Sequence, residues 1–160
     1  MRIILISVFY LIFQNIYSQE YSGKDIIGIW EVNKCELLIN GEIIKTAYIN
    51  NYGDFNKVIE GKSAGSHDQD IISLIKSILG SEITFNEDST VLWDVTLSEI
   101  NFSNGYWDLE NSGELFIGEN KYKLKYKSVL KGRITLMNSD EVKITFFTSG
   151  IENRISLIKK

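Results

Sequence analysis

Short strand-like segments recur along this chain, and tight polar turns separate them. Apolar and polar residues alternate in most segments, which is the period of a strand with one buried face. Asn40-Gly41 gives the strongest turn signal, because both central residues of a two-residue hairpin turn need a positive φ. The segments predicted as strands are 26–39, 42–49, 82–85, 91–97, 106–109, 114–117, 121–127, 134–137, 142–147 and 154–158.

This layout predicts the fold class. Strands joined by tight turns form an antiparallel meander, and a meander that closes on itself has no exposed sheet edges. We therefore expect a mainly β fold, an antiparallel barrel of about eight to ten strands in one domain over residues 24–158.

One segment has a different period. Its apolar residues recur at the spacing of one helix face, and Gly80 is placed to end a helix in the left-handed conformation. Ser66 to Gln69 fits a capping box at its start. We predict an inserted amphipathic helix near 67–79, after a polar, glycine-bearing loop over 50–65. The apolar residues of the helix are Ile71, Ile72, Leu74, Ile75, Ile78 and Leu79.

The first 18 residues have the layout of a secretory signal peptide. Arg2 supplies the positive charge, an apolar run extends from Ile3 to Phe13, and Ser18 is the small residue at the cut. The run is shorter than the roughly 20 residues of a membrane span. We expect cleavage after Ser18 and a secreted or periplasmic protein with no membrane span after cleavage. An uncleaved anchor is the alternative.

Charge and cysteine content narrow the possible partners. Removing residues 1–18 takes away one charged side chain, Arg2, so the net charge goes from −4 to −5. An acidic chain is a poor partner for nucleic acid, whose binding depends on clustered Lys and Arg. Cys35 is the only cysteine, so no internal disulfide is expected, and a strand position favours a buried, inert thiol.

Nothing in the sequence marks a reaction. His67 is the single histidine, and with Asp68 and Asp70 it suggests a metal site or an acid–base pair. Asp68 and Asp70 would project about 200° apart on a helix, however, which does not suit shared coordination. We interpret them as acidic residues at a helix N-terminus and predict no catalytic residues, no metal and no cofactor.

The aromatic residues are the candidate binding residues. Large aromatics facing the interior of a small barrel fill its base or line its cavity. For Phe85, Trp93 and Tyr126 the core and pocket interpretations are equally open. The full set of candidate ligand-binding residues, in the interior or in the helix as a lid, is Phe85, Trp93, Trp107, Tyr126, Phe146, Leu74 and Ile78.

Gly28-Ile29-Trp30 heads the first strand shortly after the signal, as the first-strand Gly-x-Trp signature does in lipocalins. Together with the hairpin over 83–91 and the segment 105–109, this resembles the secreted lipocalin-like proteins of bacteria, within the calycin group of barrels. The resemblance covers residues 24–158. It implies that Trp30 closes the base of the barrel and that a late arginine packs across it, with Arg154 the first candidate and Arg133 the alternative.

The chain departs from lipocalins at two points. It lacks their Thr-Asp-Tyr motif, and its helix lies between early strands rather than after the barrel. The resemblance implies binding of a small hydrophobic molecule without catalysis. The alternative is a filled barrel that serves as a structural or protein-interaction module of the cell envelope.

Overall fold

A computed structural model describes residues 21–50, 56–61, 68–97, 100–128, 130–148 and 151–160. The predicted signal peptide lies outside these residues. The helical elements are α2 (Gly23–Ile26), α3 (Asp68–Ile78), the 3₁₀ turn η2 (Lys121–Lys123) and α4 (Leu124–Lys127). The strands are β1 (Gly28–Ile39), β2 (Glu42–Asn50), β3 (Asn56–Gly61), β4 (Glu82–Phe85), β5 (Thr90–Leu97), β6 (Ile100–Leu109), β7 (Glu114–Gly118), β8 (Leu130–Met137), β9 (Glu141–Thr148) and β10 (Ile151–Lys159).

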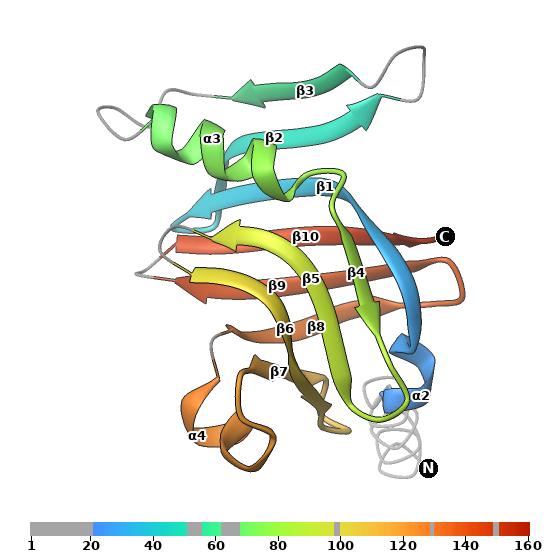
Figure 1. Cartoon of the computed structure of the whole chain (residues 1–160). Helices are drawn as coiled ribbons and strands as arrows, with labels where there is room; N and C mark the ends of the chain where they lie inside the picture. Colours follow the sequence, from blue (N-terminus) through green and yellow to red (C-terminus); the bar gives the residue numbers. More distant parts are fainter. Residues whose placement is uncertain (1–20, 51–55, 62–67, 98–99, 129, 149–150) are drawn as a thin grey trace, which may run out of the picture.

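The strands form one antiparallel sheet that closes into a barrel (Figure 1). Their order is β10-β9-β8-β7-β6-β5-β4-β1-β2-β3, and β1 also pairs with β10. The closed part is an eight-stranded antiparallel barrel of β1 and β4 to β10. The predicted fold class is therefore confirmed.

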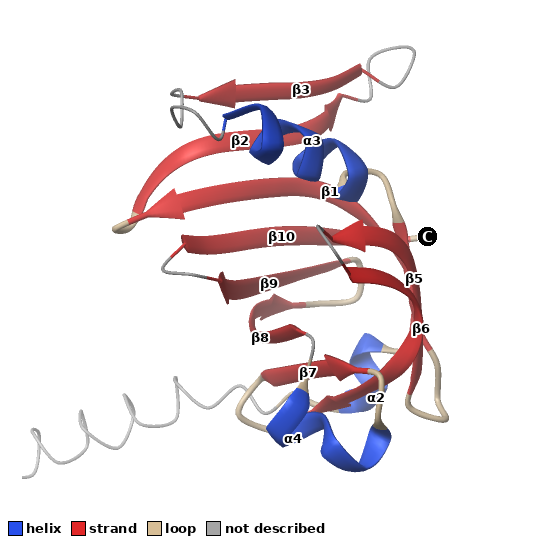
Figure 2. Ribbon diagram, turned by 60° about the vertical axis from the view of Figure 1, so that its left-hand side comes forward, coloured by secondary structure: helices blue, strands red, loops and turns tan. Residues whose placement is uncertain are grey.

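Strand β1 has different neighbours along its length. Residues 28–31 pair with β4, whereas residues 34–39 pair with β2, and β10 runs along the other side of both. The hairpin β2–β3 therefore leaves the barrel at the point where β4 ends. Figure 2 shows α3 beside this hairpin, at the opposite end of the molecule from α2 and α4.

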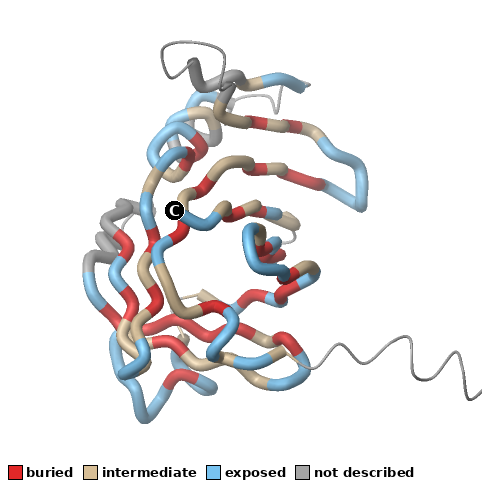
Figure 3. Tube along the Cα trace, turned by 90° about the vertical axis from the view of Figure 1, so that its right-hand side faces the viewer, coloured by how far each residue is buried: buried red, intermediate tan, exposed pale blue. Residues whose placement is uncertain are grey.

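The core follows the alternation of the strands. In β9, Val142, Ile144 and Phe146 are buried in the core, whereas Lys143 and Phe147 are exposed on the other face. Figure 3 shows the same alternation of buried and exposed positions around the barrel. Ile26 of α2 is fully buried in the same core cluster, so this short helix closes one end of the barrel.

Two local predictions are confirmed by backbone geometry. Asn40 has φ 51° and Gly41 has φ 79°, the two positive angles that the hairpin between β1 and β2 requires. Gly80 has φ 81° two residues after the end of α3, and the helix covers Asp68–Ile78, close to the predicted 67–79. The capping residue Ser66 lies outside the described residues.

The loop predicted over 50–65 is partly wrong. Asn56–Gly61 forms β3, which pairs with β2 from Lys45 to Asn50. This strand contains only two apolar residues, Val58 and Ile59, so the sequence gives little periodicity to detect. Its backbone pairing with β2 stabilises it instead. Residues 51–55 and 62–65 of the predicted loop are not described.

Candidate functional site

The aromatic residues predicted to line a cavity lie together inside the barrel. Phe85, Trp93, Trp107 and Phe146 all belong to one core cluster, and each is 0–6% exposed. The rings of Phe85 and Trp107 meet edge to face, with centroids 5.5 Å apart and planes at 82°. This geometry is favourable for two aromatic rings and fixes both side chains.

The indole N–H groups are bonded within the protein. Trp30 Nε1 donates to the carbonyl of Ile26 at 2.7 Å, and Trp107 Nε1 donates to the carbonyl of Asn86 at 3.1 Å. Trp93 Nε1 donates to Ser81 Oγ at 2.9 Å, and that hydroxyl donates in turn to the carbonyl of Ile78. These donors are occupied without a ligand.

The burial of these side chains bears on whether the barrel is hollow. A side chain that lines a hollow large enough for a guest retains accessible surface, whether or not the hollow is open to solvent. Trp30 and Phe85 retain none, Trp93 retains 2%, and Trp107 and Phe146 retain 6%. At these positions the interior is therefore filled by neighbouring side chains.

Helix α3 is part of this core. Ile75 is 6% exposed and Leu79, just after the helix, is 1% exposed, and both belong to the core cluster. Ile78 is partly buried against the cluster. The side chain of Leu74, the other predicted lid residue, lies outside the described residues. The helix contacts β5.

The predicted packing of Arg154 across Trp30 is wrong. Arg154 pairs in register with Glu36, and its Nε donates to Glu152 at 2.6 Å on the outer face. Arg133 is exposed on β8 and does not fill the role either. Lys159, opposite Trp30 in the register, places its Nζ 5.4 Å from the centre of the indole ring. A cation does cover this tryptophan, as the resemblance implies, but it is a lysine five residues further along the strand.

The prediction that 121–127 is a strand with inward tyrosines is also wrong. The segment folds as η2 and α4, which we call the 121–127 knob, and Leu124 is its buried anchor. Tyr122 is 93% exposed and Tyr126 is 90% exposed, so Tyr126 cannot line the interior. The side chain of Asn120 accepts from the backbone N–H of Tyr122 at 3.1 Å and caps the first turn.

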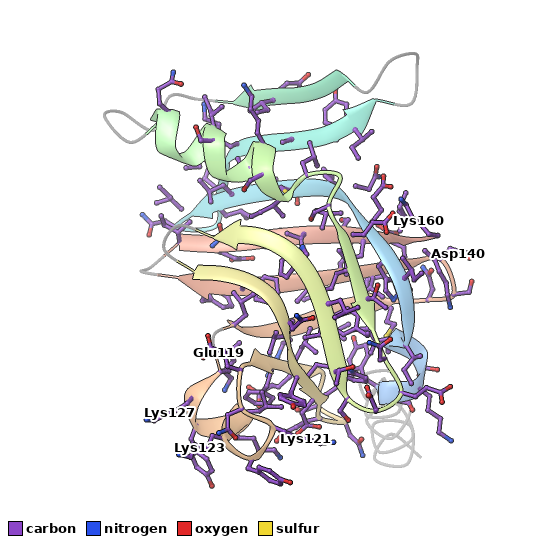
Figure 4. The ribbon with its side chains drawn as sticks, viewed as in Figure 1. Glu119, Lys121, Lys123, Lys127, Asp140 and Lys160 are labelled. Atoms are coloured by element: carbon purple, nitrogen blue, oxygen red, sulfur yellow. The ribbon has the colours of Figure 1, made fainter. Side chains whose placement is uncertain are left out.

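Two lysines attach the knob to the barrel and two do not. Lys125 Nζ lies 2.6 Å from Glu110 Oε1, and Lys121 Nζ donates to the carbonyl of Asp88 at 3.2 Å. The structure gives Lys123 and Lys127 no ion pair within its described part. Figure 4 shows Lys123 and Lys127 extending outward from the knob.

The ion pair between Glu110 and Lys125 shifts the pKa of both groups. The hydrogen bond and charge of Lys125 hold the pKa of Glu110 below its ordinary value of 4.5. The same hydrogen bond and charge raise the pKa of Lys125 above 10.5. Both groups therefore stay ionised at neutral pH, and the pair links the knob to the end of β6.

No group of three or more His, Cys, Asp or Glu residues suited to a metal ion occurs in the part of the chain that the structure covers. His67 lies outside that part. Cys35 is buried on β1, as predicted. In the same residues, no helix has the length and apolar character needed to cross a membrane.

Barrel closure and strand order define the class of this protein, an eight-stranded antiparallel barrel consistent with a calycin-like architecture. Comparison with known proteins adds no family: no protein-family model matches the chain, and no curated protein matches it. Its function must therefore be argued from its own residues.

Proposed function

We propose that this protein is a non-catalytic binding module of the cell envelope, secreted or periplasmic, with a lipocalin-like barrel filled by its own side chains. It binds an acidic protein partner through the 121–127 knob. The observation that carries this proposal is the exposure of Tyr122 and Tyr126, at 93% and 90%, within a run of four lysines.

The tyrosines are suited to be the anchors of an interface. Tyrosine offers a large, rigid contact area with few rotatable bonds, and it is enriched among residues that dominate binding energy. Leu124 and the Glu110–Lys125 pair already hold the helical turn in place, so little conformational entropy is lost on binding.

The lysines indicate the charge of the partner. Lys123 and Lys127 lie beside the tyrosines in the sequence, on a protein whose net charge is −4. A local basic surface on an acidic protein steers an acidic partner to one place and repels it elsewhere.

The proposed secretion of the protein rests on the sequence. The basic start, short apolar run and small residue over residues 1–18 support secretion. The Gly28-Ile29-Trp30 signature and the barrel topology support kinship with the secreted lipocalin-like proteins of bacteria.

Photo-crosslinking in the producing organism tests the proposal. We expect Tyr126→p-benzoylphenylalanine to crosslink one acidic protein, and we expect Lys123→Gln with Lys127→Gln to abolish the product. Leu92 on β5 is 45% exposed and serves as the matched control site for the photoreactive residue. A product that forms equally from position 92, or that survives loss of both lysines, would refute the knob as the binding surface.

A small hydrophobic ligand remains the second candidate function, and one observation favours it. Ile49, Ile59 and Ile78 pack against the core but keep part of their surface at the end where α3 meets the β2–β3 hairpin. Apolar surface of this kind can accept an apolar guest if α3 moves. Titration with an environment-sensitive fluorescent fatty acid distinguishes the two functions.

A further inference from the structure

A groove of about 680 Å³ lies on the outer face of the barrel. Strands β1, β8, β9 and β10 line it with the side chains that alternate with the core residues, among them Lys143, Thr145 and Phe147 of β9. Its volume is within the range of sites that hold small molecules. It does not involve the 121–127 knob, and its use is independent of the proposed function.

Ion pairs within the groove account for all three of its carboxylates. Glu36 lies 2.5 Å from Lys34, Glu141 lies 3.4 Å from Lys143, and Glu152 lies 2.6 Å from Arg154. Arg133 is the fourth cation of the lining, and within the described residues its guanidinium has no side-chain partner. The groove therefore carries one uncompensated positive charge on an acidic protein.

The two arginines flank one threonine. Arg133 on β8 and Arg154 on β10 are both in register with Thr145 on the intervening β9. Adjacent strands are about 4.8 Å apart, so the two arginine backbones lie roughly 10 Å from each other, a span that two long side chains can close around one anion. The chain has only three arginines, and the third, Arg2, is in the predicted signal peptide.

Arg154 and Thr145 have hydrogen-bond donors that a ligand in the groove can use. The bond from Arg154 Nε to Glu152 orients the guanidinium, and its two terminal nitrogens have no partner among the described residues. Thr145 is 5% exposed, and its hydroxyl has no hydrogen-bond partner among the described residues. Guanidinium groups match the geometry of carboxylate and phosphate oxygens, which accept two parallel bonds.

An apolar surface adjoins these donors. Phe147 follows Thr145 on the same face of β9 and is 70% exposed. An exposed phenyl ring beside a cationic site offers contact to an aryl or alkyl group that carries the anion. The ligand that fits both features is an anion with an apolar substituent.

We propose that this groove binds a small organic oxyanion, a carboxylate or a phosphate monoester with an apolar substituent. The oxyanion lies over Thr145 between Arg133 and Arg154, and the substituent lies against Phe147. Arg133 supplies the charge that no carboxylate of the groove neutralises.

Titration of the isotope-labelled protein, followed by amide NMR, tests this proposal. Phenyl phosphate and benzoate are the two organic probes, because they separate a phosphate from a carboxylate ligand, and inorganic phosphate is the probe without a substituent. We expect saturable shifts at Thr145 and Arg154 with at least one organic probe, and affinity at least about fivefold higher than for inorganic phosphate. Absence of saturable shifts with both organic probes, or equal affinity for inorganic phosphate, would overturn the assignment.

Substitutions locate the anion. We expect Arg133→Gln to weaken binding about tenfold or more, as loss of a charge-assisted hydrogen bond does, and Arg133→Lys to weaken it less. Lys131→Gln is the matched control, because Lys131 is exposed on the same strand but pairs with Glu114 outside the groove lining. An unchanged amide spectrum outside the groove verifies that the variants fold. Equal weakening by Lys131→Gln and Arg133→Gln would show a general charge effect and refute the site.

Discussion

Lys159 lies over Trp30, with its ammonium nitrogen 5.4 Å from the centre of the indole ring. The contact joins the last strand of the barrel to the first and covers the buried Trp30. Next to it, the backbone N–H of Lys160 donates to the carbonyl of Ile29 at 3.0 Å, and the side chain of Lys160 binds Glu31 and Glu82. The end of the chain is thus bonded to both β1 and β4.

Trp30→Ala should be among the most destabilising single substitutions in the chain. Trp30 is fully buried and its N–H is bonded to the carbonyl of Ile26 at 2.7 Å. We expect the free energy of unfolding to fall by about 3–5 kcal/mol in a urea melt, because the substitution leaves a large cavity. A loss below about 1 kcal/mol would mean that Trp30 does not close the barrel base.

Lys159, rather than Arg154, should be coupled energetically to Trp30. In a double-mutant cycle with Trp30→Leu, we expect Lys159→Met to give a coupling energy of about 0.5–1 kcal/mol, typical of an exposed cation over an aromatic ring. Arg154→Met, the matched control on the same strand, should give a coupling near zero. The reverse result would restore the arginine contact that the lipocalin resemblance implies.

The exposed tyrosines of the knob should contribute little to stability. We expect Tyr126→Ser and Tyr122→Ser each to change the free energy of unfolding by no more than about 0.5 kcal/mol, as surface substitutions do. Phe146→Ala, at a buried aromatic in the core, should cost about 3–5 kcal/mol. A comparable cost at Tyr126 would support the strand predicted over 121–127 and contradict the helical knob.

The pH dependence of the knob attachment follows from the pKa of Glu110, which Lys125 lowers below 4.5. A lowered pKa in the folded state means that the contribution to stability is present above 4.5 and is lost as the pH falls through the folded-state value. Carboxyl NMR should place the midpoint for Glu110 below 4.5, and Lys125→Gln should move it upward. An unchanged midpoint in that variant would show that the pair does not form.

The sequence predicted those parts of the fold in which local geometry and burial agree. The turn at Asn40-Gly41 was predictable because few residues other than Asn and Gly adopt positive φ there. Helix α3 was predictable because its apolar positions repeat over several turns. Phe85, Trp93, Trp107 and Phe146 lie inside, but the sequence did not decide between core and pocket, since that depends on how neighbouring side chains fill the space.

The errors have physical causes as well. Over 121–127 lysines alternate with Tyr122, Leu124 and Tyr126, which fits a strand, but seven residues are too few to separate the two periods. Asn120, which caps this helical turn, was the available signal. Arg154 and Lys159 are five residues apart, about 16 Å along a strand, and the register that chooses between them depends on pairing and on the bulge in β1 between Val32 and Lys34.

In the proposed function the barrel is filled by its own side chains and its partners bind outside. Titration with an environment-sensitive fluorescent fatty acid tests it most directly, because the probe reports any apolar cavity that it can enter. We predict no saturable binding at a stoichiometry of one probe per protein. Saturable one-to-one binding that Ile78→Asn weakens while the fold survives would contradict the claim and show that the protein carries its ligand inside the barrel.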